Sequence, residues 1–269
     1  MTRPADLPDY ENPPINEVVL GVQFAPPHGY QQVYAGEVWK LYKDKFPIVE
    51  ERDALPPTLE SFGSPQIGHI KFGLMSGPSH DRFWFLSKNK AELIQFQSDR
   101  FLHNWRKIGD GTNDYVRFDT MVKDYESELN SLQKYFSGFG SESLNINQCE
   151  LTYISHIPLE DDGKEGSKFD DWLNVINLNS FASDDCSLVL RKVIKNSEGN
   201  PFAALSCEAV TALGKKDKRM IALNITFRGV PSNSSVDGAL AFLKHGRSEI
   251  VNCFDQISTN FAHKTWKRK

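Results

Sequence analysis

The sequence is 269 residues long, with 39% hydrophobic and 25% charged residues, proportions that indicate a folded globular protein and exclude a disordered one. A chain of this length can bury a full core without disulfides or metals. The formal net charge of −4 gives no support to binding of nucleic acid or of an anionic membrane through overall charge.

The four cysteines are widely spaced and form no C-x-x-C pair. Because isolated cysteines in apolar runs behave as small hydrophobic residues, we expect free thiols in a reducing compartment, with neither a zinc site nor a disulfide framework. The first residues are polar and lack the apolar segment of a signal peptide, and no apolar run is long enough to cross a bilayer. These features predict a cytoplasmic protein without a membrane partner.

The first half begins with a Pro-rich leader at residues 1–14. Alternating apolar residues at 17–24 predict a half-buried strand. Apolar residues at helical spacing then predict a helix over 34–46, which Pro47 closes. Residues 47–66 are rich in proline and are expected to form a loop.

Three further strands and a helix complete the first half. The strands are expected at 69–75, 82–86 and 93–101, separated by turn residues. The helix is predicted over 120–136, where apolar residues step by four, three and four. Residues 137–143 read as a linker between the halves.

The second half predicts the same order of elements. They are a strand at 149–157, a short helix at 169–178, strands at 187–194, 203–213 and 220–230, and a helical region from about 236 that Gly246 kinks or interrupts. Each half has a tryptophan in its first helix, Trp39 and Trp172. We therefore predict an internal duplication, with residues 15–142 and 143–269 as two β-α-β-β-β-α halves that could form one continuous domain.

Strands that outnumber helices and follow one another by short connections favour an α+β fold. We expect a curved, mostly antiparallel sheet with helices on one face. The order of elements is similar to the duplicated saddle of the TATA-binding-protein-like folds. This is an analogy of fold and implies no function.

The known catalytic motifs are missing from the sequence. Residues 63–68 have P-loop spacing, but His69 stands where the loop needs its lysine. There is no H-E-x-x-H motif and no G-x-S-x-G elbow, and the histidines are scattered without ligand spacing. We predict no catalytic residue, no metal site and no cofactor.

The last strand of each half carries a row of polar side chains opposite its apolar row. The rows are Gln95, Gln97 and Asp99 in the first half and Asn224, Thr226 and Arg228 in the second. An antiparallel sheet with one solvated face produces the same pattern. The functional alternative is a platform of hydrogen-bonding groups for a partner or ligand.

Residues 99–107 are the densest stretch of mixed polar and aromatic character. Arg100, Asn104, Trp105 and Arg106 lie there, and an arginine beside a tryptophan can stack on its ring. Such clusters occur at packed strand ends and in binding hot spots alike, so both interpretations stay open.

Four segments together resemble a known family. They are the opening Pro13-Pro14-Ile15-x-Glu17-Val18-Val19, the segment Asp99-Arg100-Phe101-x-x-Asn104-Trp105-Arg106, the strand Glu150–Ile154, and the ending Phe254…Thr259…His263-x-x-Trp266. Over nearly its whole length the chain looks like a sporadically distributed family of uncharacterised bacterial proteins. The resemblance implies no activity, and a sporadic distribution implies a role in defence or in a toxin–antitoxin system. Ser155 stands where the family would have asparagine.

Three hypotheses follow. The first is a non-enzymatic interaction module that binds a protein partner through the polar rows and residues 99–107. The second is a nucleic-acid-binding protein that uses the sheet face and the basic tail at 264–269. The third is an enzyme of unfamiliar type. The sequence does not predict an oligomeric state. Whether the polar sheet face is open or covered would separate binding of a large partner from binding of a small ligand.

Overall fold

The computed structural model describes residues 7–56, 58–62, 81–109, 111, 113–160, 164–178, 183, 185–214 and 217–269. The strands in these residues are β1 Ile15–Phe24, β2 Ile48–Arg52, β3 Arg82–Leu86, β4 Glu92–Gln97, β5 Arg100–Arg106, β6 Ile146–Pro158, β7 Ser187–Lys195, β8 Pro201–Leu213 and β9 Arg219–Gly229. The helices are η1 Gln32–Tyr34, α1 Ala35–Lys40, α2 Phe118–Ser137, α3 Phe169–Trp172, α4 Val236–Ile257 and α5 Asn260–Thr265. The chain is an α+β protein, as the sequence predicted.

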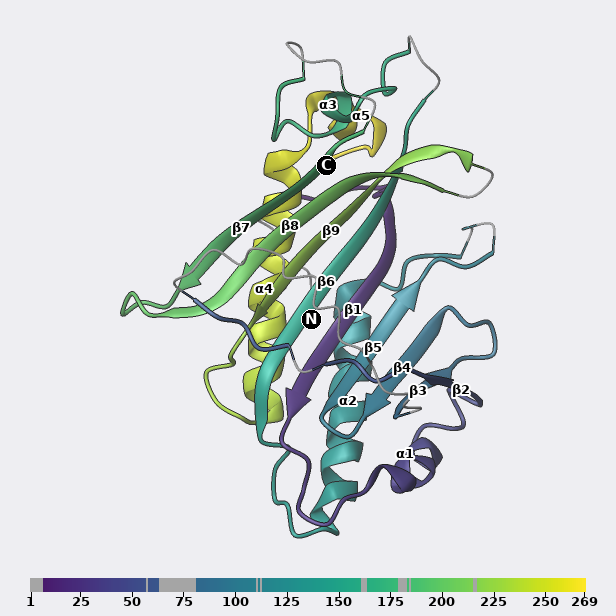
Figure 1. Cartoon of the computed structure of the whole chain (residues 1–269), viewed down its shortest axis with the longest axis vertical. Coiled ribbons are helices and arrows are strands. Elements are labelled where there is room, and N and C mark those ends of the chain that lie inside the picture. The colour runs from purple at the N-terminus through teal and green to yellow at the C-terminus, as the bar shows by residue number, and fades with distance from the viewer. Residues whose placement is uncertain are drawn as a thin grey trace.

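The described strands form one antiparallel sheet of nine strands in the order β2-β3-β4-β5-β1-β6-β9-β8-β7 (Figure 1). At its centre β1 pairs with β6, with Leu20 opposite Leu151. On either side, β1 pairs with β5 and β6 pairs with β9. The sheet therefore continues without a break from residues of the first half to residues of the second.

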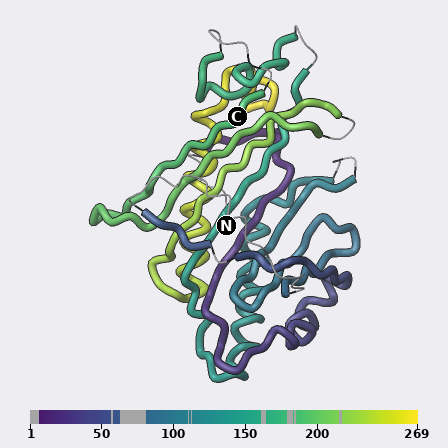
Figure 2. Tube along the Cα trace, viewed as in Figure 1, coloured from purple at the N-terminus to yellow at the C-terminus, as the bar shows by residue number. Residues whose placement is uncertain are grey.

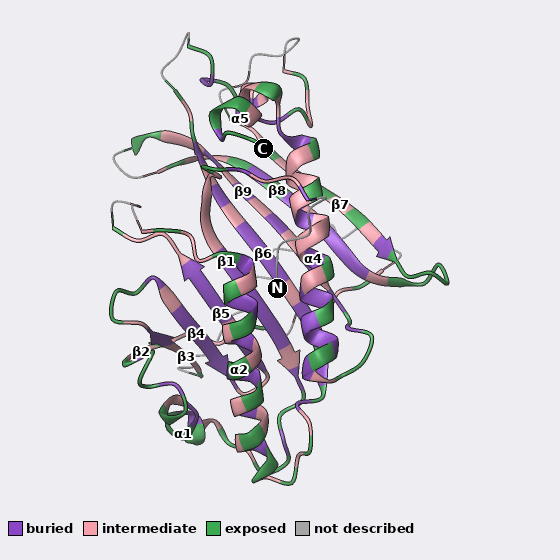
Figure 3. Ribbon diagram, turned by 180° about the vertical axis from the view of Figure 1, so that it is seen from behind, coloured by how far each residue is buried: buried purple, intermediate pink, exposed green. Residues whose placement is uncertain are grey.

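The two long helices α2 and α4 cover the same face of this sheet (Figure 3). The core lies between them and the inward side chains of the strands. On β1 the inward row is Val18, Leu20, Val22 and Phe24, each at most 2% exposed. The predicted stripe on α2, from Tyr125 to Phe136, is buried against these strands because one apolar face of an amphipathic helix turns to the core.

Gly246 does not interrupt the last long helix, so the predicted interruption was wrong. Helix α4 runs unbroken from Val236 to Ile257, and Ser235 caps it by accepting a hydrogen bond from the amide of Gly238. A Cβ at Gly246 would lie 2.6 Å from the ring of Phe227 on β9. The glycine lets the helix approach the sheet closely at this point.

The predicted strand at 93–101 is two strands joined by a tight turn. Strand β4 ends at Gln97, residues 98–99 turn, and β5 returns along it with Phe96 opposite Phe101. The turn contains Ser98 and Asp99 without a glycine, so the usual hairpin signal was missing. Asp99 therefore lies in the turn, beyond the row formed by Gln95 and Gln97.

Other boundaries in the first half also differ from the predictions. The helix expected over 34–46 is regular only over α1, and residues 41–46 continue in turns such as the hydrogen bond from the amide of Tyr42 to the carbonyl of Trp39. The expected loop at 47–66 contains the edge strand β2. The strand expected at 69–75 lies outside the described residues. In the second half, the helix expected over 169–178 is the single turn α3.

The C-terminal segment packs against residues near the start of the described chain. Trp266 stacks on Trp172 with ring centroids 5.5 Å apart, and Tyr10 donates a hydrogen bond of 2.7 Å to Asp255. Three of the four cations of the basic tail are paired with carboxylates: Arg268 with Asp255, Lys267 with Glu11 at 2.7 Å, and Lys269 with Asp9 at 4.0 Å. The tail is therefore a docked segment with much of its charge neutralised.

Candidate binding site on the strapped face of the sheet

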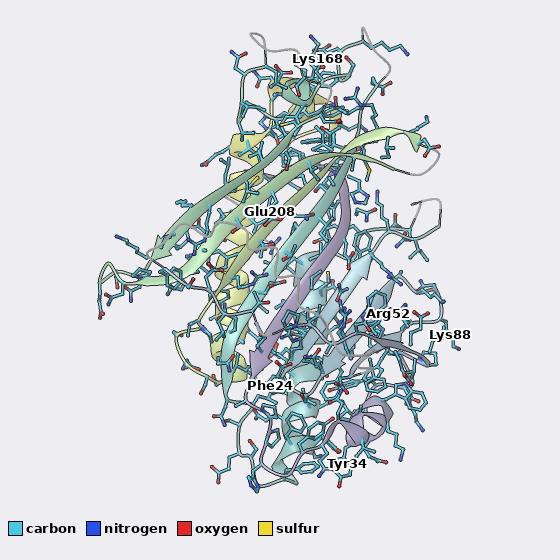
Figure 4. All side chains as sticks on the ribbon, in the orientation of Figure 1. Phe24, Tyr34, Arg52, Lys88, Lys168 and Glu208 are labelled. Carbon is cyan, nitrogen blue, oxygen red and sulfur yellow. The ribbon has the colours of Figure 1, made fainter. Side chains whose placement is uncertain are left out.

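The face of the sheet opposite α2 and α4 carries the polar rows that the sequence predicted. Strand register places Gln95 beside Leu102 and Gln97 beside Arg100, while Phe96 and Ile94 point to the helices. Figure 4 labels Arg52 on β2 and Glu208 on β8, toward opposite edges of this face. The alternation of the strands thus predicted correctly which side chains turn away from the helices.

In the first half these side chains form a continuous hydrogen-bonded ladder across four strands. The carbonyl oxygen of Gln95 accepts from Arg82 at 2.6 Å and from the indole of Trp84 at 3.1 Å. Its amide nitrogen donates to Asn104 at 3.0 Å, and Asn104 donates to Glu17 at 2.6 Å. Because Gln95 and Asn104 are less than 10% exposed, this ladder holds the strands together and is not an open surface.

Glu17 ends the ladder in a partly desolvated position. Burial raises the pKa of its carboxyl above the usual 4.5, and the amide of Asn104 and the charge of Arg106 only partly offset that increase. At the other end of the ladder, burial lowers the pKa of Arg82. Repulsion from the positive charges of Arg100 and Arg52 lowers it further. The ladder therefore has an acid at β1 and a crowded set of guanidinium groups at β3 and β2.

A segment of the chain crosses this polar face, and we call residues 53–62 the strap. It follows β2 and runs over the sheet toward β7 (Figure 2). The side chain of Gln97 accepts from the amide of Leu55 at 2.8 Å and donates to its carbonyl at 3.0 Å. Gln23 makes the same pair of bonds with Thr58, at 3.2 and 2.7 Å. Two glutamine side chains thus bind the strap through its backbone.

The far end of the strap is fixed to the second half. Arg191 on β7 forms an ion pair with Glu60 and donates to the carbonyl of Ser61 at 2.6 Å. Its guanidinium lies 6.0 Å from the ring centroid of Phe62. In the middle, Arg100 donates to the carbonyl of Pro56 at 2.9 Å. The polar face is therefore covered in part by the chain itself.

A pocket of about 300 Å³ lies between the strap and the sheet. Its lining residues are Gly21, Val22, Gln23, Leu55, Pro56, Thr58, Arg100, Leu102, Gln148, Cys149, Glu150 and Arg228. Gln148 on β6 is opposite Gln23 in the register and only 1% exposed, yet within the described part of the chain its amide nitrogen has no hydrogen-bond partner. A buried donor without a partner costs about 1–3 kcal/mol, so an acceptor at this position would stabilise the protein.

The polar face of the second half is less densely bonded. Glu150 and Arg228 form an ion pair across β6 and β9, and the hydroxyls of Thr152 and Thr226 share a hydrogen bond of 2.9 Å. The carbonyl oxygen of Asn224 is buried and has no hydrogen-bond partner in the described ranges. The polar side chains of the second half thus bond in isolated pairs or leave a hydrogen-bonding group unsatisfied, whereas those of the first half form a continuous ladder.

The residues predicted to bind a partner occupy several different environments and do not form one surface. Gln97, Arg100 and Arg228 contact or border the pocket under the strap. Gln95 and Asn104 belong to the ladder, Asp99 accepts from Gln97 and Arg100 in the turn, and Asn224 and Thr226 lie on β9. Trp105 is in the core, where it packs on Tyr115, and Arg106 instead lies over Trp84 at 5.4 Å. A binding role for these residues stays a prediction.

Sequence reasoning missed Gln23, Gln148 and the strap. The sequence contained a signal for both glutamines, because each is next to an apolar residue that faces the helices. Gln23 follows Val22 and Gln148 precedes Cys149, so both glutamines face away from the helices. The strap had no such signal, since its binding depends on side chains from distant strands.

A second cavity, of about 270 Å³, lies on the helix side. It is largely apolar, and residues near its mouth pair with one another: Arg247 with Asp119 at 2.8 Å, and Tyr115 with Tyr153 at 3.5 Å. Because these polar groups bind each other, this cavity gives less indication of a missing ligand than the pocket under the strap does.

Two comparisons with known proteins found no relative of this chain. No family model matches it, and no curated protein matches its sequence. Within the described part of the chain, no three His, Cys, Asp or Glu side chains are placed to hold a metal ion. The same residues contain no helix with the length and apolarity needed to cross a membrane.

Proposed function

We propose that this protein is a non-enzymatic binding module that holds an extended peptide segment of a partner protein under the strap. The observation that carries the proposal is the amide nitrogen of Gln148, which is buried, lines the pocket and has no hydrogen-bond partner among the described residues. An amide donor of this kind fits a backbone carbonyl of a bound segment.

The strap itself supports this class of ligand. Gln97 and Gln23 each bind one residue of an extended segment through its amide and its carbonyl. Gln148 is the neighbour of Gln23 across β1 and β6 and offers the same side chain. Two glutamines of this face thus bind peptide backbone, and the amide nitrogen of a third, Gln148, has no partner among the described residues.

The charges of the pocket also favour a neutral polar ligand. Arg100 and Arg228 line it, but Asp99 and Glu150 pair with them. A peptide group supplies an acceptor without adding charge, whereas a phosphate would need cations that are not already paired. A peptide is therefore favoured over a nucleic acid as the ligand of this pocket.

We further propose that the module arose by internal duplication and works in the bacterial cytoplasm, as part of a defence or toxin–antitoxin system. The duplication is supported by the strand order. About the centre of the sheet, β1 of the first half corresponds to β6 of the second half, and β5 corresponds to β9. A saddle-shaped fold has the same arrangement. The cellular role rests on the resemblance of the segments around Glu17, Arg106 and Trp266 to the bacterial family.

Selection from a phage-displayed library of random 12-residue peptides tests the binding proposal. We expect enriched peptides whose affinity falls about tenfold on Gln148→Leu, because one buried hydrogen bond is lost. Asn130→Ala, an exposed position on α2, is the matched control and should leave affinity unchanged. Peptides that bind equally well to the Gln148→Leu variant, or a selection without enrichment, would overturn the proposal.

A further inference from the structure

Two of the four cysteines meet between the sheet and α4. Cys207 is on β8 with its side chain toward the helices, opposite Ile225, and Cys253 is in the last turns of α4. The two thiols interact with each other, and the pKa of each is shifted by the other. Both line a groove of about 380 Å³ at the edge of the helix layer. This meeting was not expected from the sequence, where the two residues are far apart.

The two thiols differ in their surroundings. Cys207 is only 4% exposed, whereas Cys253 is partly exposed in the groove. The interaction with Cys207 and the charge of Lys192 lower the pKa of Cys253, while the same interaction and burial raise the pKa of Cys207. A thiol with a lowered pKa and access to solvent is the more nucleophilic of a pair.

We propose that Cys253 and Cys207 form a peroxide-sensitive modification site that closes to a disulfide between α4 and β8. The Cys253 thiolate attacks one oxygen of hydrogen peroxide, the O–O bond breaks, and the leaving hydroxide takes a proton to become water. The product is a sulfenic acid at Cys253. Cys207 then loses its proton and attacks the Cys253 sulfur, and the displaced hydroxide leaves as a second water. Two thiols are thereby oxidised, and one peroxide is reduced to two waters.

The remaining cysteines are poor alternatives for this chemistry. Cys149 is fully buried at the centre of the sheet, and burial raises the pKa of its thiol. Burial also raises the pKa of Cys186, just before β7. The proposed disulfide would join the helix layer to the sheet in the second half, away from the pocket under the strap. Neither cysteine lines the pocket under the strap.

Peroxide treatment of the full chain, followed by alkylation and peptide mapping, tests the site. We expect a crosslinked peptide pair containing Cys207 and Cys253, with a mass loss of two hydrogens relative to the reduced protein. In the Cys149→Ser/Cys186→Ser variant, which keeps only the proposed pair, the count of free thiols should fall from two to none. The melting temperature should rise by about 5 °C or more, because the bond closes a long loop.

A Cys207→Ser variant separates the two chemical steps. It should stop at the sulfenic acid, which dimedone would label at Cys253, whereas the Cys253→Ser variant should take no label at Cys207. Should the double serine variant fail to fold, peptide mapping of the wild-type chain gives the same answer. Recovery of both thiols unmodified after peroxide, or oxidation of Cys253 only to the sulfinic acid, would overturn the proposal.

Discussion

The polar face of the sheet differs sharply between its two halves. In the first half, Asn104 links Gln95 to Glu17 in a buried ladder, and the strap covers what remains. In the second half, Thr152 and Thr226 bond only to each other or to near neighbours, and Asn224 keeps an acceptor without a partner. Both halves have the same alternation of polar and apolar residues along their strands.

This difference shows that alternation determines which face a side chain occupies but not what covers it. A polar row exposed to water and a polar row bonded to a crossing segment have the same sequence pattern. Here the covering segment comes from residues 53–62, which follow the edge strand β2 and are bound through their backbone. The contribution of a polar side chain to the free energy of unfolding therefore depends on which half of the sheet carries it.

The largest expected effect comes from the same substitution made in each half. Asn104→Ala removes the middle of the ladder and leaves buried groups of Gln95 and Glu17 without partners, so we expect the free energy of unfolding to fall by about 3 kcal/mol. Asn224→Ala removes a side chain whose buried acceptor is already unsatisfied, so its effect should stay below about 1 kcal/mol. Urea unfolding of both variants measures the two values. Equal losses would contradict the contrast between the halves.

Loosening the strap should have an intermediate effect. Gln97→Ala removes both bonds to the backbone of Leu55, and we expect a loss of about 1–2 kcal/mol of stability. More specifically, hydrogen exchange at the amide of Leu55 should accelerate, because its acceptor is gone. Arg191→Ala is the control, since it frees the other end of the strap and should leave the Leu55 amide protected. An unchanged exchange rate at Leu55 in Gln97→Ala would show that the strap is held by other contacts.

Much of the fold could be predicted because its signals are local. The strands β1, β6, β8 and β9 show period-two alternation, and α2 shows a clear helical stripe, so their positions were predicted to within a few residues. The turn at Ser98 and Asp99 was missed because neither residue marks a hairpin as glycine or asparagine would. Gly246 was misread because its role depends on the ring of Phe227, which is distant in the sequence.

The candidate site could be predicted only in part, for the same reason. The outward direction of Gln97 and Arg228 follows from their own strands. The partners of those side chains, and the unpaired amide of Gln148, depend on how β1 and β6 are brought together and on the course of the strap. Tryptophan is a residue type common in binding sites, yet the position of Trp105 in its strand directs the side chain toward the core.

The second half offers a smaller test of the same contrast. Thr226→Val keeps the shape of the side chain and removes its bond to Thr152, a residue that also approaches Glu150 at 3.4 Å. We expect a loss of at most about 1 kcal/mol, because the hydroxyl of Thr152 that loses this partner still donates to Glu150. Thermal melting and urea titration of the variant and the wild type would detect this loss of stability. A loss as large as that of Asn104→Ala would mean that the second row is as tightly coupled as the first.

The smallest expected effect is a dependence on pH that comes from Glu17. Burial raises the pKa of this carboxyl above 4.5, so the folded chain binds the proton more tightly than the unfolded chain does. The contribution of Glu17 to the free energy of unfolding is therefore most favourable below pH 4.5, and it is lost as the pH rises through the folded-state pKa. Glu17→Gln keeps an acceptor for Asn104 and removes the titration.

The difference between wild type and Glu17→Gln isolates this contribution, since the other titrating groups are common to both. Measured by urea unfolding from about pH 4 to about pH 8, the wild type should lose stability relative to the variant as the pH rises, and the difference should then level off. A difference that is flat, or that changes in the opposite direction, would mean that the bond from Asn104 and the charge of Arg106 outweigh burial. In that case the end of the ladder would be an ordinary solvated carboxylate, and the two halves of the face would be more alike than the hydrogen bonds indicate.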